Sequence, residues 1–175
     1  MKDYPSVLSP TEIRFERLLP GPIENVWAYL TDARKRGEWL ASGPMEPKVG
    51  GKIALRFKHA ELSPNHAAPP EKYTKMDAEG HHAEETVTGF DPPRRLAFTW
   101  GGDSEVVFEL APQDGKVLLT LTHRKLPTEA ERNGNAAGWH CHLAVLVDKL
   151  EGRPPPAFWD IFRKVSAEYA HGIPR

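Results

Sequence analysis

The fold is decided by residues 138–152, which read Gly138-Trp139-His140-Cys141-His142-Leu143-Ala144-Val145-Leu146-Val147-Asp148-Lys149-Leu150-Glu151-Gly152. The large apolar side chains of this stretch recur at helical spacing and form one stripe: Trp139, Leu143, Leu146 and Leu150. Gly152 ends the helix, and the prolines at 154–156 prevent it from resuming. The pattern predicts a helix over about 135–151 that must bury its stripe against another element.

Stretches in which apolar and polar residues alternate precede this helix and indicate strands. They cover residues 11–19, 50–58, 84–90, 96–100, 106–110 and 117–123. Asp114-Gly115 signals a hairpin between the last two, because both residues tolerate positive φ. We therefore expect an α+β fold, with a curved antiparallel sheet of about six or seven strands wrapped round the long helix. A cavity between sheet and helix is a natural place for a small ligand.

Shorter elements surround this framework. Residues 1–10 are polar and contain prolines, so a loose lead-in is expected. Pro22 is suited to the first position of a short helix, because its missing N–H would be unsatisfied there. A second short helix is predicted from Asp32 toward Trp39. The spacing of polar residues in 128–131 resembles a capping box and predicts a separate short helix before the main one.

Composition bounds the class of protein. The chain has 175 residues, 39% of them hydrophobic and 27% charged, which predicts a single globular domain over 1–175. Its core is expected over 11–152, and residues 153–175 form a tail in which 158–171 indicate a helix. The formal net charge of −1 favours neither nucleic acid nor an anionic membrane as a partner. Cys141 is the only cysteine, so no intramolecular disulfide is possible.

Targeting signals are not visible in the sequence. No apolar core follows the first residues, and no apolar run is long enough to span a bilayer. A cytoplasmic location is the expectation that follows.

Four motifs follow one another along the chain: Pro22-Ile23-Glu24-Asn25-Val26-Trp27 with Leu30-Thr31-Asp32, Pro92-Pro93-Arg94-Arg95-Leu96 with Phe98-Thr99-Trp100, Leu119-Thr120-Leu121-Thr122-His123, and Gly138-Trp139 through Leu150-Glu151-Gly152. Their order over about 11–152 resembles the SRPBCC (START-like) superfamily, and within it the subfamily related to the C-terminal domain of the activator of heat-shock protein 90 ATPase. The resemblance implies a helix-grip fold with a cavity. It implies no single activity, because superfamily members bind lipids, hormones or polyketides and a few catalyse cyclisation or hydrolysis. Residues 59–83 and 153–175 depart from the family pattern.

Six side chains are expected to line the cavity: Phe57, Trp100, Phe108, His123, Trp139 and Leu143. The tryptophans are core residues that can also serve as cavity wall. His123 lies on the inward parity of its strand, either as a satisfied histidine or as a polar anchor for a ligand. Arg17 lies on an inward parity too, where it either pairs with a carboxylate, meets an anionic ligand, or is turned to solvent by a bulge.

Catalytic and metal-binding patterns are missing from the sequence. His140 and His142 are two apart on a helix and face different ways, whereas a zinc-binding helix presents histidines four apart. Cys141 lies in mid-helix, away from the helix N-terminus that would lower its pKa. We therefore predict no catalytic residue, no metal site and no cofactor.

Three functions are compatible with these observations. The leading hypothesis is a protein that binds a small, largely apolar molecule, with His123 or Arg17 fixing its polar end, in a role related to stress. The alternatives are a cyclase or hydrolase on the same fold, and a co-chaperone-like protein that acts on a heat-shock ATPase. A homodimer is compatible with all three.

Residues 59–83 form the longest predicted excursion from the sheet. The segment is polar and proline-rich, and its sizeable apolar residues are Leu62, Tyr73 and Met76. Long loops in compact domains are functional or disordered. The segment is therefore either a lid held over one end of the cavity by these three side chains or a solvated loop.

Overall fold

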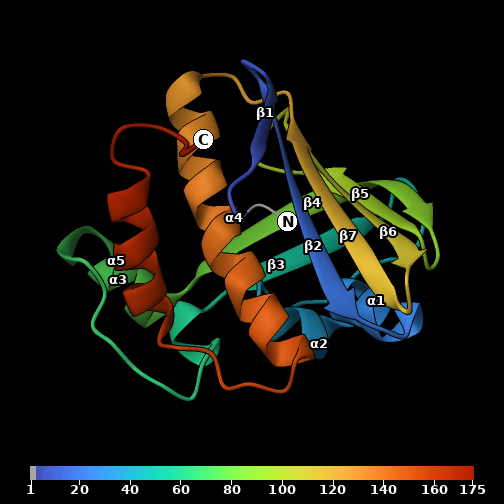
Figure 1. The fold of residues 1–175 in the computed structure, drawn as a ribbon, viewed down its shortest axis with the longest axis horizontal. Helices are drawn as coiled ribbons and strands as arrows, with labels where there is room; N and C mark the ends of the chain where they lie inside the picture. The colour runs from blue at the N-terminus through green and yellow to red at the C-terminus, as the bar shows by residue number, and fades with distance from the viewer. Residues whose placement is uncertain (1–2) are drawn as a thin grey trace.

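The computed structural model describes residues 3–175, and its framework is a seven-stranded antiparallel sheet in the order β1-β2-β7-β6-β5-β4-β3. The strands are β1 Ser6–Ser9, β2 Glu12–Pro20, β3 Lys52–Phe57, β4 His81–Asp91, β5 Arg95–Thr99, β6 Glu105–Gln113 and β7 Lys116–Arg124. The helices are α1 Ile23–Thr31, α2 Ala33–Gly37, α3 Thr74–Glu79, α4 Glu129–Leu150 and α5 Phe158–Glu168, with short 3-10 turns η1 His59–Glu61 and η2 Glu71–Tyr73. The curved sheet with a long helix across it confirms the predicted helix-grip architecture (Figure 1).

The register of β2 and β7 shows how alternation builds the inner face of the sheet. Ile13 lies opposite His123, and Phe15 lies opposite Leu121. All four side chains are completely buried, whereas Arg14 and Glu16 between them are exposed. A period of two therefore sends one side of each strand toward α4 and the other to solvent.

Helix α4 buries the predicted stripe. Trp139, Leu143 and Leu146 are at most 2% exposed, and Leu150, in the last turn, is partly buried. The helix is longer than predicted, because Thr128 caps α4 itself: its Oγ accepts from the N–H of Glu131 at 3.1 Å. The prediction of a separate short helix at 128–131 was wrong, since the glycines and asparagines that follow are tolerated inside a helix held by tertiary packing.

Three other boundaries differ from the predictions. Residues Ser6–Ser9 form the edge strand β1 rather than a loose lead-in, because Val7 pairs with Ile13 in a hairpin. Pro22 caps α1 with extended backbone instead of occupying its first turn. The excursion ends earlier than expected, because 81–83 already pair with β3 as part of β4. In residues 3–175, no helix is both long and apolar enough to cross a bilayer.

Replacing Leu146 with Ala should lower the free energy of unfolding by about 2–5 kcal/mol, because the side chain is completely buried between α4 and the sheet. Urea unfolding followed by tryptophan fluorescence measures the change. Val49→Ala, at a side chain that is 64% exposed, is the control and should change the value by less than about 0.5 kcal/mol. Equal stabilities of Leu146→Ala and the natural chain would contradict this packing of α4.

Candidate functional site

Two cavities adjoin on the side of α4 that faces β3, β4 and β5. We call the first the edge cavity: it measures about 260 Å³ and is lined by Leu55, Phe57, His59, Met76, His81, Ala83, Glu85, Trp100, Gly101 and His142. We call the second the helix cavity: it measures about 400 Å³ and is lined by Tyr73, Trp100, Glu131, Gly134, Asn135, Gly138, Trp139 and His142. Trp100 and His142 belong to both linings, so one pair of side chains forms the wall where the cavities meet.

Two glycines of α4 leave the helix cavity open. Gly134 and Gly138 are four residues apart, so they lie on one face of the helix. A Cβ built at either position would meet no atom within 4 Å. Packing therefore does not require glycine here, although glycine in a helix interior is unfavourable relative to alanine.

The segment 59–80, which we call the roof segment, covers these cavities. Leu62 is 1% exposed and belongs to the core, Met76 lines the edge cavity, and Tyr73 lines the helix cavity. These are the three apolar side chains expected to hold the segment down. The segment is therefore packed on the domain, and its role as a lid stays a prediction.

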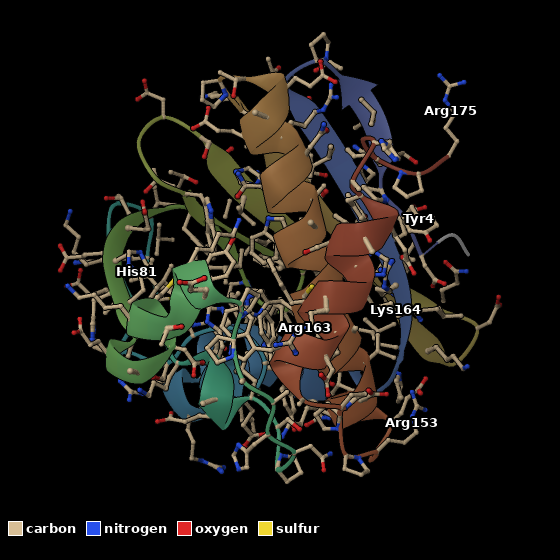
Figure 2. The ribbon with its side chains drawn as sticks, turned by 90° about the vertical axis from the view of Figure 1, so that its left-hand side faces the viewer. Tyr4, His81, Arg153, Arg163, Lys164 and Arg175 are labelled. Carbon is tan, nitrogen blue, oxygen red and sulfur yellow. The ribbon has the colours of Figure 1, made fainter. Side chains whose placement is uncertain are left out.

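The roof segment is held in place by the C-terminal tail. Trp159 of α5 donates from Nε1 to Oδ1 of Asp77 at 2.7 Å, and its ring stacks on Tyr73 with centroids 5.4 Å apart. The Ser63 hydroxyl donates to the carbonyl of Pro155 at 2.6 Å. Figures 1 and 2 show α5 and α3 side by side on one flank of α4, with His81 near α3 in Figure 2. The two segments that depart from the family pattern therefore form one structural unit.

His142 is the most enclosed polar group of the cavity wall. It is 7% exposed, and its Nδ1 donates to the carbonyl of Trp39 at 2.8 Å. Burial, followed by the neighbouring His59, lowers the pKa of His142 to about 3. The ring is therefore neutral near pH 7, and its one proton lies on Nδ1 because a carbonyl can only accept. Nε2 is left as a hydrogen-bond acceptor.

His59, at the start of the roof segment, packs against α4 and α5. Its ring centroid is 4.4 Å from that of Phe158 and 5.5 Å from that of His142. Burial, and secondarily His81, lowers the pKa of His59 to about 4, so this ring is also neutral near pH 7. Within residues 3–175, no three His, Cys, Asp or Glu side chains are grouped so as to hold a metal ion.

The predicted ligand-binding residues divide into two layers. Phe57 and Trp100 line the edge cavity, and Trp100 and Trp139 line the helix cavity. Phe108, His123 and Leu143 line neither cavity. They are at most 1% exposed and belong to the packed layer beneath.

His123 has both ring nitrogens occupied. Nδ1 accepts from the indole N–H of Trp139 at 3.1 Å, so Nε2 carries the proton and donates to the Ser104 hydroxyl at 3.1 Å. Burial lowers its pKa to about 4. Of the two interpretations of His123, the structure favours the satisfied histidine over the ligand anchor.

Arg17 lies away from the two cavities. Four strands separate β2 from β3 in the sheet. The Arg17 guanidinium donates to the carbonyls of Asp3 at 2.7 Å and Glu16 at 2.8 Å, on the side of the N-terminal segment. The expectation that Arg17 meets a ligand in the same cavity as Trp100 does not fit this placement, because Arg17 lines neither cavity and two strands separate β2 from β5.

The sequence interpretation anticipated a covering segment but missed the polar wall and the contact of that segment with α5. His142 was considered only as a metal ligand, although it lies three residues after Trp139 and so shares a face with it. Gly134 and Gly138 at i and i+4 were a readable sign of an open helix face. No sequence signal placed His59 against α5, because that contact depends on tertiary packing.

Replacing Gly134 or Gly138 with Ala should raise the free energy of unfolding by about 1 kcal/mol each, because alanine is the better helix former and its methyl enters open space. Gly43→Ala is the contrasting variant: Gly43 has a φ of +130°, and a Cβ there would overlap the Ala54 carbonyl oxygen, so stability should fall. Chemical unfolding of the three variants measures this. Loss of stability in both helix variants would show that the space is filled.

Stability should fall as the pH is lowered from about 6.5 to about 4.5. The buried rings of His59, His123 and His142 have pKa values of about 4, 4 and 3, below the ordinary 6.5. In this window the unfolded chain binds protons that the folded chain does not, so the free energy of unfolding decreases with falling pH.

Urea unfolding at a series of pH values measures this dependence, and His59→Phe should make it shallower. The carboxyl groups whose pKa values are lowered, such as those of Asp32 and Glu61, act mainly below this window. A flat profile between pH 6.5 and 4.5 would contradict neutral burial of these rings.

Comparison with known proteins places this chain in a family. The profile of the family described as Activator of Hsp90 ATPase homolog 1-like protein matches residues 20–151. A Bordetella parapertussis protein with a solution NMR structure is 45% identical, with a TM-score of 0.80 over 94% of this chain and 87% of that one. No protein of curated function matches the chain.

More distant structures share the fold alone. CalU16 from Micromonospora echinospora is 22% identical, with a TM-score of 0.64 over 91% of this chain and 86% of that one. The Aha1 dimer from Colwellia psychrerythraea is 18% identical, with a TM-score of 0.58 over 80% of this chain and 96% of that one. The family match spans α1, the strands from β3 to β7 and α4. The chain therefore belongs to the Activator of Hsp90 ATPase homolog 1-like protein family, within the START-like superfamily that its motifs resemble.

Proposed function

We propose that the protein binds a small, largely apolar molecule in the edge and helix cavities. The observation that carries the proposal is that two cavities of about 260 and 400 Å³ lie side by side and share Trp100 and His142 in their linings. Sites for small molecules measure roughly 300–1,000 Å³ and combine apolar walls with a few fixed polar groups. Phe57, Trp139 and Met76 supply apolar wall here, and His142 supplies a fixed polar group.

The chemistry of the site supports binding rather than turnover. A general acid or base works best with a pKa near the working pH, whereas the pKa values of His59 and His142 are lowered to about 4 and 3. Cys141 is completely buried, and burial raises its pKa to about 12, so it is no nucleophile near neutral pH. A cyclase or hydrolase stays the alternative, and it would need a group that titrates closer to neutrality.

The roof segment completes the proposal as a lid. Tyr73 and Met76 cover the two cavities, and the contacts of Trp159 hold them there. Closing such a cover excludes water from a bound molecule. Ligand exchange then requires the roof segment and α5 to move together.

Assembly and location are further parts of the proposal. The edge strand β1 exposes Val7 and Leu8 at 47% and 45%, which supports pairing of two copies, as an Aha1 relative forms a dimer. The single cysteine is a buried free thiol, which supports a reducing compartment such as the cytoplasm.

A screen of small apolar and aromatic compounds should identify molecules that raise the unfolding temperature and change tryptophan fluorescence, because Trp100 and Trp139 line the cavities. Ala83→Leu should fill the edge cavity and Gly138→Leu the helix cavity. The stabilisation by a ligand should be lost in at least one of these variants.

Ala144→Leu is the matched control, because Ala144 belongs to the same helix but lines a different groove beside α5. It should keep the ligand response of the natural chain. Compounds that stabilise all three variants equally would place the ligand elsewhere and contradict the proposal.

A further inference from the structure

The lining of the two cavities is rich in hydrogen-bond acceptors and contains no lysine or arginine among the described residues. Its carboxylates are those of Glu85 and Glu131. Glu85 accepts from the Gly101 N–H at 2.8 Å, and Glu131 accepts from the Thr128 hydroxyl at 2.9 Å. An anionic ligand would lose its hydration here without gaining a cationic partner, which is costly. The lining thus disfavours carboxylates and phosphates.

One acceptor is held in a fixed position. Among residues 3–175, every fully enclosed side-chain nitrogen or oxygen has a hydrogen-bond partner. His142 is 7% exposed, and its one hydrogen bond runs from Nδ1 to the carbonyl of Trp39. Nε2 has no partner, so it must border open space, and the space that His142 borders is the two cavities. A ligand that donates a hydrogen bond to Nε2 would satisfy it.

The helix cavity favours a flat molecule. On one side the backbone of α4 is bare at Gly134 and Gly138, which lets a ligand approach the helix closely. The other walls carry the rings of Tyr73, Trp100 and Trp139, and the centroids of the two tryptophans lie 4.8 Å apart. Aromatic walls favour stacked or edge-on contacts with another ring.

We infer that the ligand is a planar, uncharged aromatic molecule whose O–H or N–H group donates to Nε2 of His142 while its ring lies over Gly134 and Gly138. His142 is then the residue that determines specificity, and the glycine face of α4 admits the ring. The inference rests on the proposed binding function and adds the chemical class of the ligand. A protonated amine is the competing class, because it would use the carboxylates instead.

A matched set of naphthalenes tests the class. We would measure dissociation constants at pH 7 by tryptophan quenching and calorimetry for 2-naphthol, 2-methoxynaphthalene, 2-naphthoate and the ammonium of 2-naphthylmethylamine. Leaving a buried acceptor unpaired costs about 1–3 kcal/mol, so 2-naphthol should bind about tenfold tighter than 2-methoxynaphthalene. Naphthoate should bind weakest of the four.

Two variants locate the contacts. His142→Phe keeps a ring and removes the acceptor. The preference for 2-naphthol over 2-methoxynaphthalene should therefore fall from about tenfold to none. Gly138→Leu should weaken all four compounds, and it keeps the test decisive where His142→Phe does not fold. Ala144→Leu should leave all four affinities unchanged.

Several outcomes would overturn the inference while leaving the proposed function standing. These are equal affinities for 2-naphthol and 2-methoxynaphthalene, tightest binding of naphthoate or the ammonium, and an unchanged preference in His142→Phe. Unchanged affinities in Gly138→Leu would show that the ring of the ligand does not lie over Gly134 and Gly138. Failure of all four compounds to bind would also overturn the inference, and the broader compound screen then decides the proposed function separately.

Discussion

A chain of three hydrogen bonds ties the long helix to the sheet, and the site depends on it. The indole N–H of Trp139 donates to Nδ1 of His123, Nε2 of His123 donates to the Ser104 hydroxyl, and that hydroxyl donates to the Trp100 carbonyl. The chain works only with a neutral His123, because a protonated ring would turn its Nδ1 proton toward the donor of Trp139. It thereby sets the positions of Trp100 and Trp139, which form cavity walls.

The cavities exist because large rings lie next to helix positions that carry no side chain. The rings of Phe57, Trp100 and His142 fill the wall between sheet and helix. Gly134 and Gly138 then leave two adjacent positions on one face of α4 without a side chain. Helical glycines are unfavourable, so the open face is a cost that the apolar stripe of α4 offsets by burial.

The C-terminal tail is a part of the molecule that lies outside the family match. The family match covers residues 20–151, whereas α5 lies beyond it. Yet Phe158 and Trp159 pack on His59, and the side chain of Trp159 bonds Asp77. The tail and the roof segment therefore hold each other in place beside the two cavities.

The sequence by itself determined the framework: period-two alternation in the strands and the Trp139–Leu150 stripe specify a sheet closed by one helix, since burial requires each apolar face to find a partner. It also determined that His140 and His142 lie on different faces of the helix, because they are two residues apart and helical geometry is local. Only the tertiary structure decided the site. Arg17 and Trp100 both have inward parity, yet Arg17 lies on β2 and Trp100 directly follows β5, with β7 and β6 between these two strands. Parity carries no information about strand order. The roles of the two histidines depend on hydrogen-bond partners from other elements. His123 is a structural link because it accepts from Trp139, and His142 keeps an open acceptor because its other nitrogen donates to the Trp39 carbonyl.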